Sequence, residues 1–391
     1  MNRETFLWEV HHSPYPSQFL IGTCQFGESL PLYLVDQFDG KRPALLNDEF
    51  LSNKKITFNI YPSALLDSNI LDAIDKRVSR KVVSDGLEGF LRFVTEKGWD
   101  FSPWFYYMEH FAKSAPHDFL PNAIRRTEAL LRLHSMDEKH FLSTGEIIPN
   151  PEAVTRYTSE VGAKTLQEVA EHRVKSFANA YNRQVLVEMI EATQIALIKM
   201  VLLHKHEQPK ASPARKLEEF IRFLREDLGI MLAREAHLAL HYFCDRAGKL
   251  LGIQSNTSIE KALSTIQSTA WDIFLLRFPE MLFSESPYEL CIAYVATHEK
   301  RLQELARLFT IERIHSNSSS GFASHVRYDL SSIPEEVVAE IPDDFGIPPT
   351  LIDLSARKSL SVPTGLLSAL ERELTKFCYD AQPVNPHGAA R

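Results

Sequence analysis

The chain has 391 residues, of which 44% are hydrophobic and 24% are charged, and its formal net charge is −8 at pH 7. This length and composition predict a globular protein with a sizeable core, divided into two or three structural units. The negative net charge excludes a broad basic coat for nucleic acid and leaves room for a local basic groove.

No segment of the sequence predicts export or membrane insertion. The first residues, Met-Asn-Arg-Glu-Thr-Phe, lack the apolar core of a signal peptide. The longest apolar run, near 195–203, is interrupted by Lys199 and is far too short to span a bilayer. The four cysteines include no Cys-x-x-Cys pair, which is typical of buried thiols in a reducing compartment. We therefore expect a soluble cytoplasmic protein with no membrane partner.

Residues 1–55 predict a β-rich segment. Apolar and polar residues alternate along Phe19–Phe26 and again along Leu30–Phe38, and a Gly-Glu-Ser turn separates the two runs. This pattern is typical of a β-hairpin. Asp39-Gly40 is a second turn signal.

The next stretch carries the first candidate for chemistry. Ala64–Leu66 predict a buried strand of a parallel sheet, and Asp67 then lies at the carboxyl end of that strand. Ser68 and Asn69 favour the opening of a helix over Ile70–Arg80. Open α/β sheets bind ligands at that edge, and a carboxylate beside an amide suits a hard cation such as Mg²⁺ or Mn²⁺. The simpler interpretation is that Asp67 only caps the helix, so a catalytic role requires partners.

Two further helices are predicted before the long charged segment. One covers Leu87–Thr95, and the next covers Trp104–Lys113, with Ser102 as its cap and Pro103 in its first turn. The second helix is rich in aromatic side chains, so we expect it to be deeply buried. Glu109 lies in the middle of this helix and needs a partner or a shifted pKa, because burying a lone carboxylate is costly. The simpler interpretation is that Glu109 pairs with a nearby Lys or Arg or reaches the solvent.

Residues 118–262 are helical and charged. An apolar stripe from Leu166 to Leu203 predicts one helix of about 40 residues, roughly 60 Å long. Prolines then break the pattern, and a second long helix is expected over Lys216–Arg246. The two helices would form an antiparallel hairpin with His204 solvated at its tip. This hairpin offers a surface for a protein partner or for a homo-oligomer.

The pattern of buried strands resumes after this segment. Helical spacing is found over Ser258–Ser268 and over Trp271–Phe278, and the second stretch carries Asp272. Leu290–Thr297 is a near-continuous apolar run that predicts a second buried parallel strand, with Glu299 just past its end. The remaining expected elements are a helix after Arg301, a strand over Phe309–Ile314 and a final helix over Leu366–Cys378.

Four acidic residues from distant parts of the chain are therefore expected at one edge of a parallel sheet. Asp67 and Glu299 would come from strand ends, and Glu109 and Asp272 from helices. Parallel strands joined by crossover helices bring their carboxyl ends to the same edge. Four carboxylates there would repel one another by several kcal/mol unless cations neutralise them. Two metal ions about 4 Å apart can activate a water and stabilise the leaving oxygen in phosphodiester hydrolysis.

This order of acids resembles the PIN-like nuclease domain. The matching motifs are Leu66-Asp67-Ser68-Asn69, the helix with Glu109, Ala270-Trp271-Asp272-Ile273, and Thr297-His298-Glu299. They fall within about 57–115 and 265–315, roughly a quarter of the chain. The sequence departs from the family pattern at Glu299, where an Asp is usual. The stretch between Glu109 and Asp272 is also far longer than in small PIN toxins, and we interpret it as an insertion.

The resemblance implies an α/β fold, with a PIN-like parallel sheet flanked by helices, a long helical-hairpin insertion and an N-terminal β-rich segment. The expected divisions are 1–55 for the β-rich segment, 56–117 and 263–315 for the two parts of the PIN-like domain, 118–262 for the insertion and 316–391 for a C-terminal extension.

The resemblance further implies an endonuclease that depends on Mg²⁺ or Mn²⁺ and cleaves RNA, with a toxin, RNA-processing or defence role. Asp67 and Asp272 would be the main metal ligands. Glu109 and Glu299 would complete the site or orient waters, and Asn69 would assist by hydrogen bonding.

Three other interpretations stay open. Arg234 and His241 resemble the Arg-x₄₋₆-His motif of the HEPN ribonucleases, but an Arg and a His on one helix face often occur by chance. A phosphatase of the haloacid dehalogenase type would have a second acid where Asn69 stands. A catalytically degenerate PIN-like module would instead bind protein through its helical insertion. The basic residues near the expected rim, which are candidates for phosphate contacts, are Arg77, Arg80, Lys81, Lys300 and Arg301.

Overall fold

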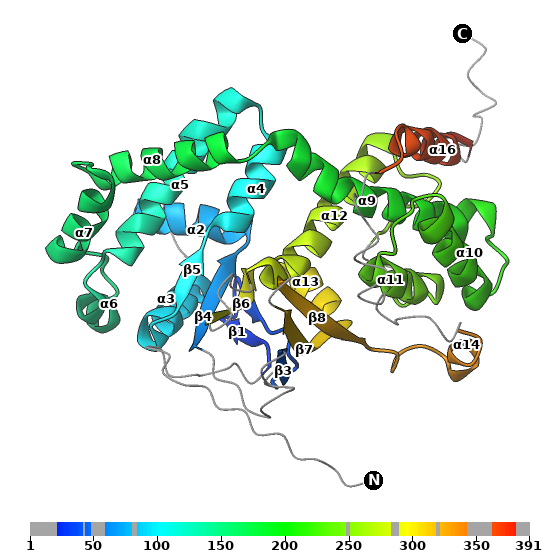
Figure 1. Cartoon of the computed structure of the whole chain (residues 1–391), viewed down its shortest axis with the longest axis horizontal. Coiled ribbons are helices and arrows are strands. Elements are labelled where there is room, and N and C mark those ends of the chain that lie inside the picture. Colours follow the sequence, from blue (N-terminus) through cyan, green and yellow to red (C-terminus); the bar gives the residue numbers. More distant parts are fainter. Residues whose placement is uncertain are drawn as a thin grey trace, which may run out of the picture. The chain divides into compact units, whose positions relative to one another are not determined.

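The computed structural model of the chain describes residues 22–41, 44–47, 59–79, 84–247, 251–282, 289–317, 321–341 and 362–380. The chain divides into two compact units (Figure 1). The first unit is formed by Met1–Leu186 and Leu275–Arg327, and the second by Val187–Phe274 and Tyr328–Arg391. These divisions fall at other positions than the predicted boundaries at 118 and 262.

A five-stranded sheet forms the centre of the first unit, with the strand order β1-β2-β6-β4-β5. The strands β6, β4 and β5 are parallel to one another, and Leu66 at the end of β4 pairs with Ala296 in β6. Both predicted buried strands are therefore confirmed as parallel neighbours, whereas the short strand β5 was not predicted. The bounds are β1 Cys24–Phe26, β2 Leu32–Val35, β4 Asn59–Leu66, β5 Asp100–Ser102 and β6 Glu289–Thr297.

The predicted N-terminal hairpin is confirmed in its described part. The strands β1 and β2 are antiparallel, with Cys24 opposite Leu34, and β2 continues antiparallel onto β6. The turn at Asp39-Gly40 is also confirmed, because both residues adopt left-handed backbone angles, with φ of 53° and 68°.

A second, three-stranded sheet has the order β3-β7-β8. Its strand β7 confirms the strand predicted over Phe309–Ile314, and β3 is parallel to it. The strand β8 lies in a stretch where only turns were expected. The bounds are β3 Ala44–Asn47, β7 Phe309–Asn317 and β8 Gly321–Tyr328.

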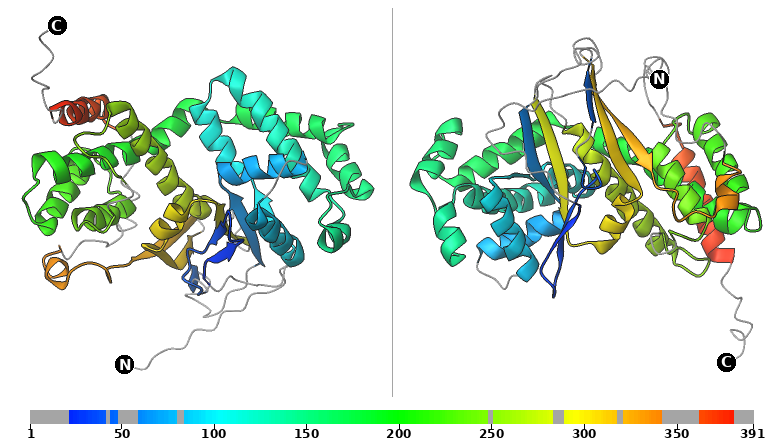
Figure 2. Two further views of the ribbon diagram at one scale, coloured as in Figure 1. Left: turned by 180° about the vertical axis from the view of Figure 1, so that it is seen from behind. Right: turned by 90° about the horizontal axis from the view of Figure 1, so that it is seen from below.

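Helices cover the five-stranded sheet and extend away from it in layers. The helices α2 and α4 follow the strands β4 and β5 directly, and α5 packs against α2 and α8. Figure 1 and Figure 2 both show α5 and α8 side by side, beyond α2 and α4 as seen from the sheet. The bounds are α2 Ser68–Val78, α3 Asp85–Lys97, α4 Trp104–Lys113, α5 Pro116–His134, α6 Glu138–Thr144, α7 Pro151–Val161, α8 Leu166–Ala180 and α13 Lys300–Ala306.

The prediction of one long helix from Leu166 to Leu203 is wrong. The helix α8 ends at Ala180, α9 covers Arg183–Leu202, and a π-helical turn, η1, covers Leu203–Glu207. The backbone of Tyr181 is extended, with φ −107° and ψ 139°. Asn182 then starts the next helix, because its Oδ1 accepts from the backbone N–H of Gln184 at 2.9 Å. Apolar spacing alone does not reveal such a break.

The helix predicted over Lys216–Arg246 is also broken. It consists of α10, Pro213–Glu226, and α11, Ala233–Phe243, with Gly229 between them at φ +71°. Conversely, the two short helices predicted between Ser258 and Phe278 are one helix, α12, over Ile259–Met281. The second unit also contains α14, Glu335–Val338, and α16, Leu366–Asp380, which confirms the predicted final helix.

Where the structure describes helices, none combines the length and the apolar character that crossing a bilayer requires.

Candidate functional site

The ends of β4 and β6 form the candidate site. Asp67 follows the last residue of β4, and Thr297 is the last residue of β6. The backbone N–H of Asp67 donates to the carbonyl of Ala296 at 3.0 Å, so the parallel pairing continues to the tips of both strands. Two residues that are 230 positions apart in the sequence are thereby brought into contact.

Hydrogen bonds from Ser68, Asn69 and Thr297 hold the Asp67 carboxylate. Its Oδ1 accepts from the backbone N–H of Ser68 at 2.6 Å. Its Oδ2 accepts from Asn69 Nδ2 at 2.6 Å and from Thr297 Oγ1 at 2.7 Å. Asp67 is also the N-terminal cap of α2, so the simpler interpretation holds for its local contacts. The bond from Thr297 goes beyond capping, since it fixes the carboxylate to the neighbouring strand.

The donors to Asp67 are themselves oriented. Asn69 Oδ1 accepts from the backbone N–H of His298 at 3.3 Å, which directs its Nδ2 toward Asp67. Thr297 Oγ1 accepts from the backbone N–H of Glu299 at 3.0 Å. The hydroxyl proton of Thr297 is then directed at Asp67 Oδ2. The carboxylate therefore lies in an environment in which its donors cannot easily turn away.

Glu109 joins this network through Ser68. The Ser68 hydroxyl donates to Glu109 Oε2, while its backbone N–H donates to Asp67. Lys113 Nζ donates to Glu109 Oε1 at 2.6 Å, so the predicted need for a partner is confirmed. The predicted deep burial of α4 is right for Phe105 but wrong for Trp104, whose side chain is 41% exposed.

The two remaining acids lie less centrally. Glu299 follows β6 as predicted, but its side chain is 47% exposed and its Oε2 lies 3.7 Å from Arg301 Nη2. Asp272 is half-buried on α12, in the part of that helix that belongs to the second unit. Its role as a metal ligand therefore stays a prediction.

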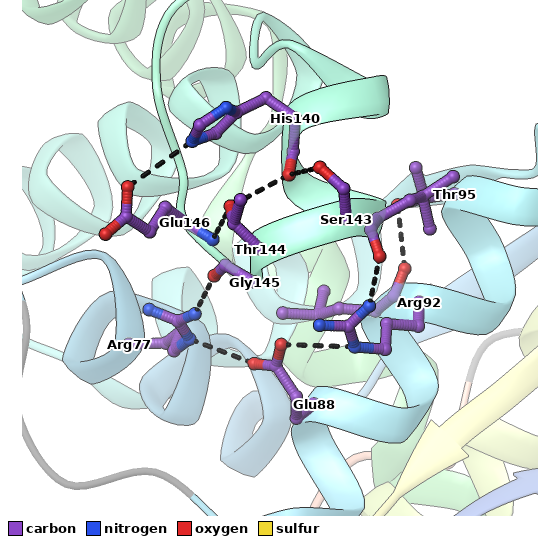
Figure 3. A network of polar contacts seen from close by, with 11 residues as sticks. Arg77, Glu88, Arg92, Thr95, His140, Ser143, Thr144, Gly145 and Glu146 are labelled. Atoms are coloured by element: carbon purple, nitrogen blue, oxygen red, sulfur yellow. Dashed lines mark hydrogen bonds and ion pairs between the residues drawn. The ribbon is translucent and has the colours of Figure 1, made fainter.

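The basic residues of the expected rim are largely engaged in ion pairs. Arg77 Nε donates to Glu88 Oε2 at 3.2 Å, and Arg77 also donates to the carbonyl of Gly145 (Figure 3). Glu88 in turn lies 3.5 Å from Arg92, so this network ties α2, α3 and the end of α6 together. These contacts give Arg77 a structural role, which explains this arginine without a contact to a phosphate. Lys300 and Arg301 lie 3.8 Å and 3.7 Å from Glu304 and Glu299, and Arg80 and Lys81 lie outside the described residues.

The chemistry of Asp67 and Glu109 fits a hard divalent cation. Carboxylate oxygens such as those of Asp67 and Glu109 are ligands that hard cations such as Mg²⁺ prefer. Mg²⁺ is usually held by one or two carboxylates together with several waters. Among the described residues, no three His, Cys, Asp or Glu side chains gather closely enough to hold a metal ion. Asp67, Glu109 and Glu299 are thus not gathered into one three-carboxylate site in this geometry.

Several residues of the network were not predicted as site residues. Ser68, Thr297 and His298 stand inside the quoted motifs, where they served only as spacers. The signal that could have found Thr297 is its position at the strand end beside Asp67. His298 Nδ1 donates to the carbonyl of Pro31 at 2.9 Å, and its buried Nε2 has no hydrogen-bond partner among the described residues.

The alternative pair on α11 is enclosed in the core of the second unit. Arg234 and His241 are 4% and 2% exposed. His241 Nε2 lies 3.0 Å from His237 Nε2 and 3.0 Å from the carbonyl of Asp329. Burial lowers the pKa of His241. These contacts indicate a role in the core, because an RNA phosphate cannot reach a fully buried side chain.

The strand tips therefore provide the site on which a functional assignment depends. The Asp67 carboxylate is fixed there, and Ser68 connects it to the Glu109 carboxylate by donating one hydrogen bond to each. The strand tips also lie at the carboxyl edge of a parallel sheet, where open α/β sheets bind ligands. Comparison of the chain with protein-family models, with curated proteins and with solved structures finds no match.

Proposed function

We propose that the protein is a divalent-metal-dependent endonuclease of the PIN-like type that cleaves RNA phosphodiester bonds, with a toxin or defence role as the biological setting. One observation carries this proposal. Asp67 at the tip of β4 is fixed by Thr297 at the tip of β6 and by Asn69, and Ser68 links it to Glu109. A carboxylate needs such support when it has to hold a cation in one geometry.

Each residue of the site would have its own role. Asp67 and Glu109 would hold Mg²⁺ or Mn²⁺, and Asn69 and Thr297 would orient Asp67. Glu299 would complete the site or orient waters. When bound, the metal supplies an activated water and stabilises the leaving oxygen of the phosphodiester.

The test is cleavage of labelled RNA and single-stranded DNA with Mn²⁺ and with a chelator. The wild type should cleave RNA only when the metal is present. The variant Asp67→Asn should lose this activity, because it removes a charge from a proposed ligand. Asp75→Asn is the matched control, since Asp75 lies on α2 as well but pairs with Arg125 at 2.8 Å. Cleavage that persists in Asp67→Asn would falsify the site assignment.

A second candidate function is a catalytically degenerate module that binds protein. Two observations favour it. Lys113 already occupies Glu109 Oε1. Tyr181, between α8 and α9, and Val185, in the first turn of α9, are large apolar side chains that are 39% and 51% exposed. Absence of cleavage by the wild type, together with no thermal shift on adding Mn²⁺, would support this function. Light scattering would then show whether the exposed residues join two copies of the chain.

A further inference from the structure

A cavity of about 270 Å³ lies in the first unit, along the strand β5. β5 is the last strand of the five-stranded sheet, so one of its sides carries no neighbouring strand from the part of the chain that the structure describes. The cavity lies on residues of β5 and of the helices α4, α5, α7 and α8. The lining residues that matter here are Phe101, Trp104, Tyr107, His134, Tyr157 and Arg173.

Flat aromatic side chains form much of the wall. Trp104 is 41% exposed, so its ring is accessible to a ligand, whereas the guanidinium groups of Arg156 and Arg173 lie over the Tyr157 ring. The Tyr107 hydroxyl is engaged with Thr127 Oγ1 at 2.6 Å, which keeps that ring in place. Aromatic faces of this kind stack nucleobases without requiring a particular base, and one stacked base contributes about 1–3 kcal/mol.

The cavity also contains an unsatisfied hydrogen-bonding atom. His134 Nε2 is buried and has no hydrogen-bond partner among the described residues. Burial lowers the pKa of His134, and the positive charge of Arg173 lowers it further, while Asp100 raises it. A buried polar atom without a partner is unusual, and His134 is among the residues that line the cavity.

Arg173 brings positive charge to the cavity. Its guanidinium lies 5.3 Å from the centre of the Tyr157 ring. It also lies 3.8 Å from Glu160, but both side chains are exposed, so this pair is weak. A phosphate group would compete well for the guanidinium, because Arg binds phosphate through two parallel hydrogen bonds.

We propose that this cavity binds one unstacked nucleobase of the RNA substrate, with the adjoining phosphate on Arg173. The cavity volume of about 270 Å³ lies just below the range for sites of drug-sized ligands, about 300–1,000 Å³, which suits a single base. The inference depends on the proposed function for the identity of the substrate. Its position agrees with that function, since Ser102 of the cavity pairs with Leu65, two residues before Asp67.

The structure offers a matched pair of arginines for the test. Arg156 and Arg173 both lie 5.3 Å from the Tyr157 ring centre, but only Arg173 is among the residues that line the cavity. The experiment measures binding of a fluorescent single-stranded RNA decamer and of the four ribonucleoside 5′-monophosphates. It uses the full chain carrying Asp67→Asn, so that the RNA stays intact.

We expect Arg173→Gln to weaken binding of the RNA about tenfold, which corresponds to the loss of one charge-assisted contact, and Arg156→Gln to leave it unchanged. Trp104→Leu should weaken it by a similar factor through lost stacking. Thermal melting of each variant shows that the fold is kept. Equal affinities of the two arginine variants, or failure of every probe to bind, would overturn the inference.

The two proposals fail in different ways. If the wild type never cleaves RNA but Arg173→Gln still binds more weakly than Arg156→Gln, the cavity is a nucleotide site and the nuclease assignment is wrong. If the wild type cleaves RNA and the two arginine variants bind alike, the nuclease assignment stands and the cavity proposal is wrong.

Discussion

The hydroxyl group of Thr297 connects Asp67 to the neighbouring strand β6. Thr297 Oγ1 donates to Asp67 Oδ2 at 2.7 Å. Thr297→Val removes this donor and keeps the shape of the side chain. We expect Mn²⁺ affinity and RNA cleavage to fall about 10- to 100-fold, as is usual when a residue that orients a metal ligand is lost.

The matched control for this variant is Thr95→Val. Thr95 Oγ1 donates to the carbonyl of Leu91 at 2.7 Å within α3, so its loss removes a similar hydroxyl away from the site. Mn²⁺ titration followed by thermal shift measures the affinity, and single-turnover cleavage measures the rate. If both variants behave like the wild type, Thr297 does not support a metal ligand.

The residue scale also shows which parts of the site the sequence could predict. Asp67 and the strand end at Thr297 follow from short apolar runs, which are local signals. The contact between Ser68 and Glu109 joins residues 41 positions apart. It depends on where α4 lies relative to β4, and nothing in the spacing of either segment determines that position.

His204 is a residue for which the sequence interpretation was wrong. It was expected to be solvated at a helix tip, but it is 7% exposed. In the π-helical turn its Nδ1 lies 3.1 Å from Lys216 Nζ, and its Nε2 lies 3.2 Å from Asp245 Oδ1. Lys216 is itself 3% exposed, and burial lowers its pKa. A buried ammonium therefore depends on a neutral imidazole as acceptor.

We expect His204→Leu to lower the free energy of unfolding by about 3 kcal/mol, because Lys216 would lose its acceptor while it stays buried. The carbonyl of Pro209, at 3.4 Å, is a longer contact that compensates poorly. His206→Leu is the control, since His206 is two residues away and exposed. Urea unfolding measures both variants, and equal midpoints would contradict the prediction.

At the scale of elements, the hairpin β1–β2 packs directly on the backbone of α3. A Cβ atom added at Gly86 would lie 2.5 Å from the carbonyl oxygen of Leu30 and 2.8 Å from that of Phe26. One at Gly89, a turn further along the helix, would lie 3.4 Å from Phe26 Cβ, which is an ordinary contact. The two glycines therefore differ in surroundings and share a helix.

We expect opposite signs for the two substitutions to alanine. Gly86→Ala should destabilise the protein by about 1–3 kcal/mol, because the backbones would have to move apart. Gly89→Ala should be neutral or stabilise it by up to about 1 kcal/mol, because alanine favours the helix. Differential scanning calorimetry measures both. A loss of similar size in the two variants would show that the close approach is not what constrains Gly86.

The elements that could be predicted are those with a strong local pattern. The buried strands β4 and β6 and the final helix were found from apolar runs or helical spacing. The break between α8 and α9 was missed because the apolar stripe continues across Asn182. The strand β5 was missed because its three residues are too few to show alternation, and it exists through pairing with β4.

At the scale of the whole molecule, burial lowers the pKa of several histidines. For each of them burial is the largest cause, and for His237 the pKa falls to about 3. The residues are His110, His134, His204, His237 and His241. In the unfolded chain they would titrate near the ordinary value of about 6.5. Below that pH the unfolded chain binds protons that the folded chain does not bind.

Stability should therefore be highest above pH 6.5 and fall as the pH drops toward 3. The loss approaches about 1.4 kcal/mol per pH unit for each histidine that stays neutral in the folded state. His237→Gln removes one such group, so the fall in the free energy of unfolding between pH 7.5 and pH 5 should become shallower. His117→Gln, at a side chain that is 81% exposed, should leave the slope unchanged. Urea unfolding at several pH values measures the slopes, and equal slopes for both variants would mean that His237 takes up protons in the folded protein.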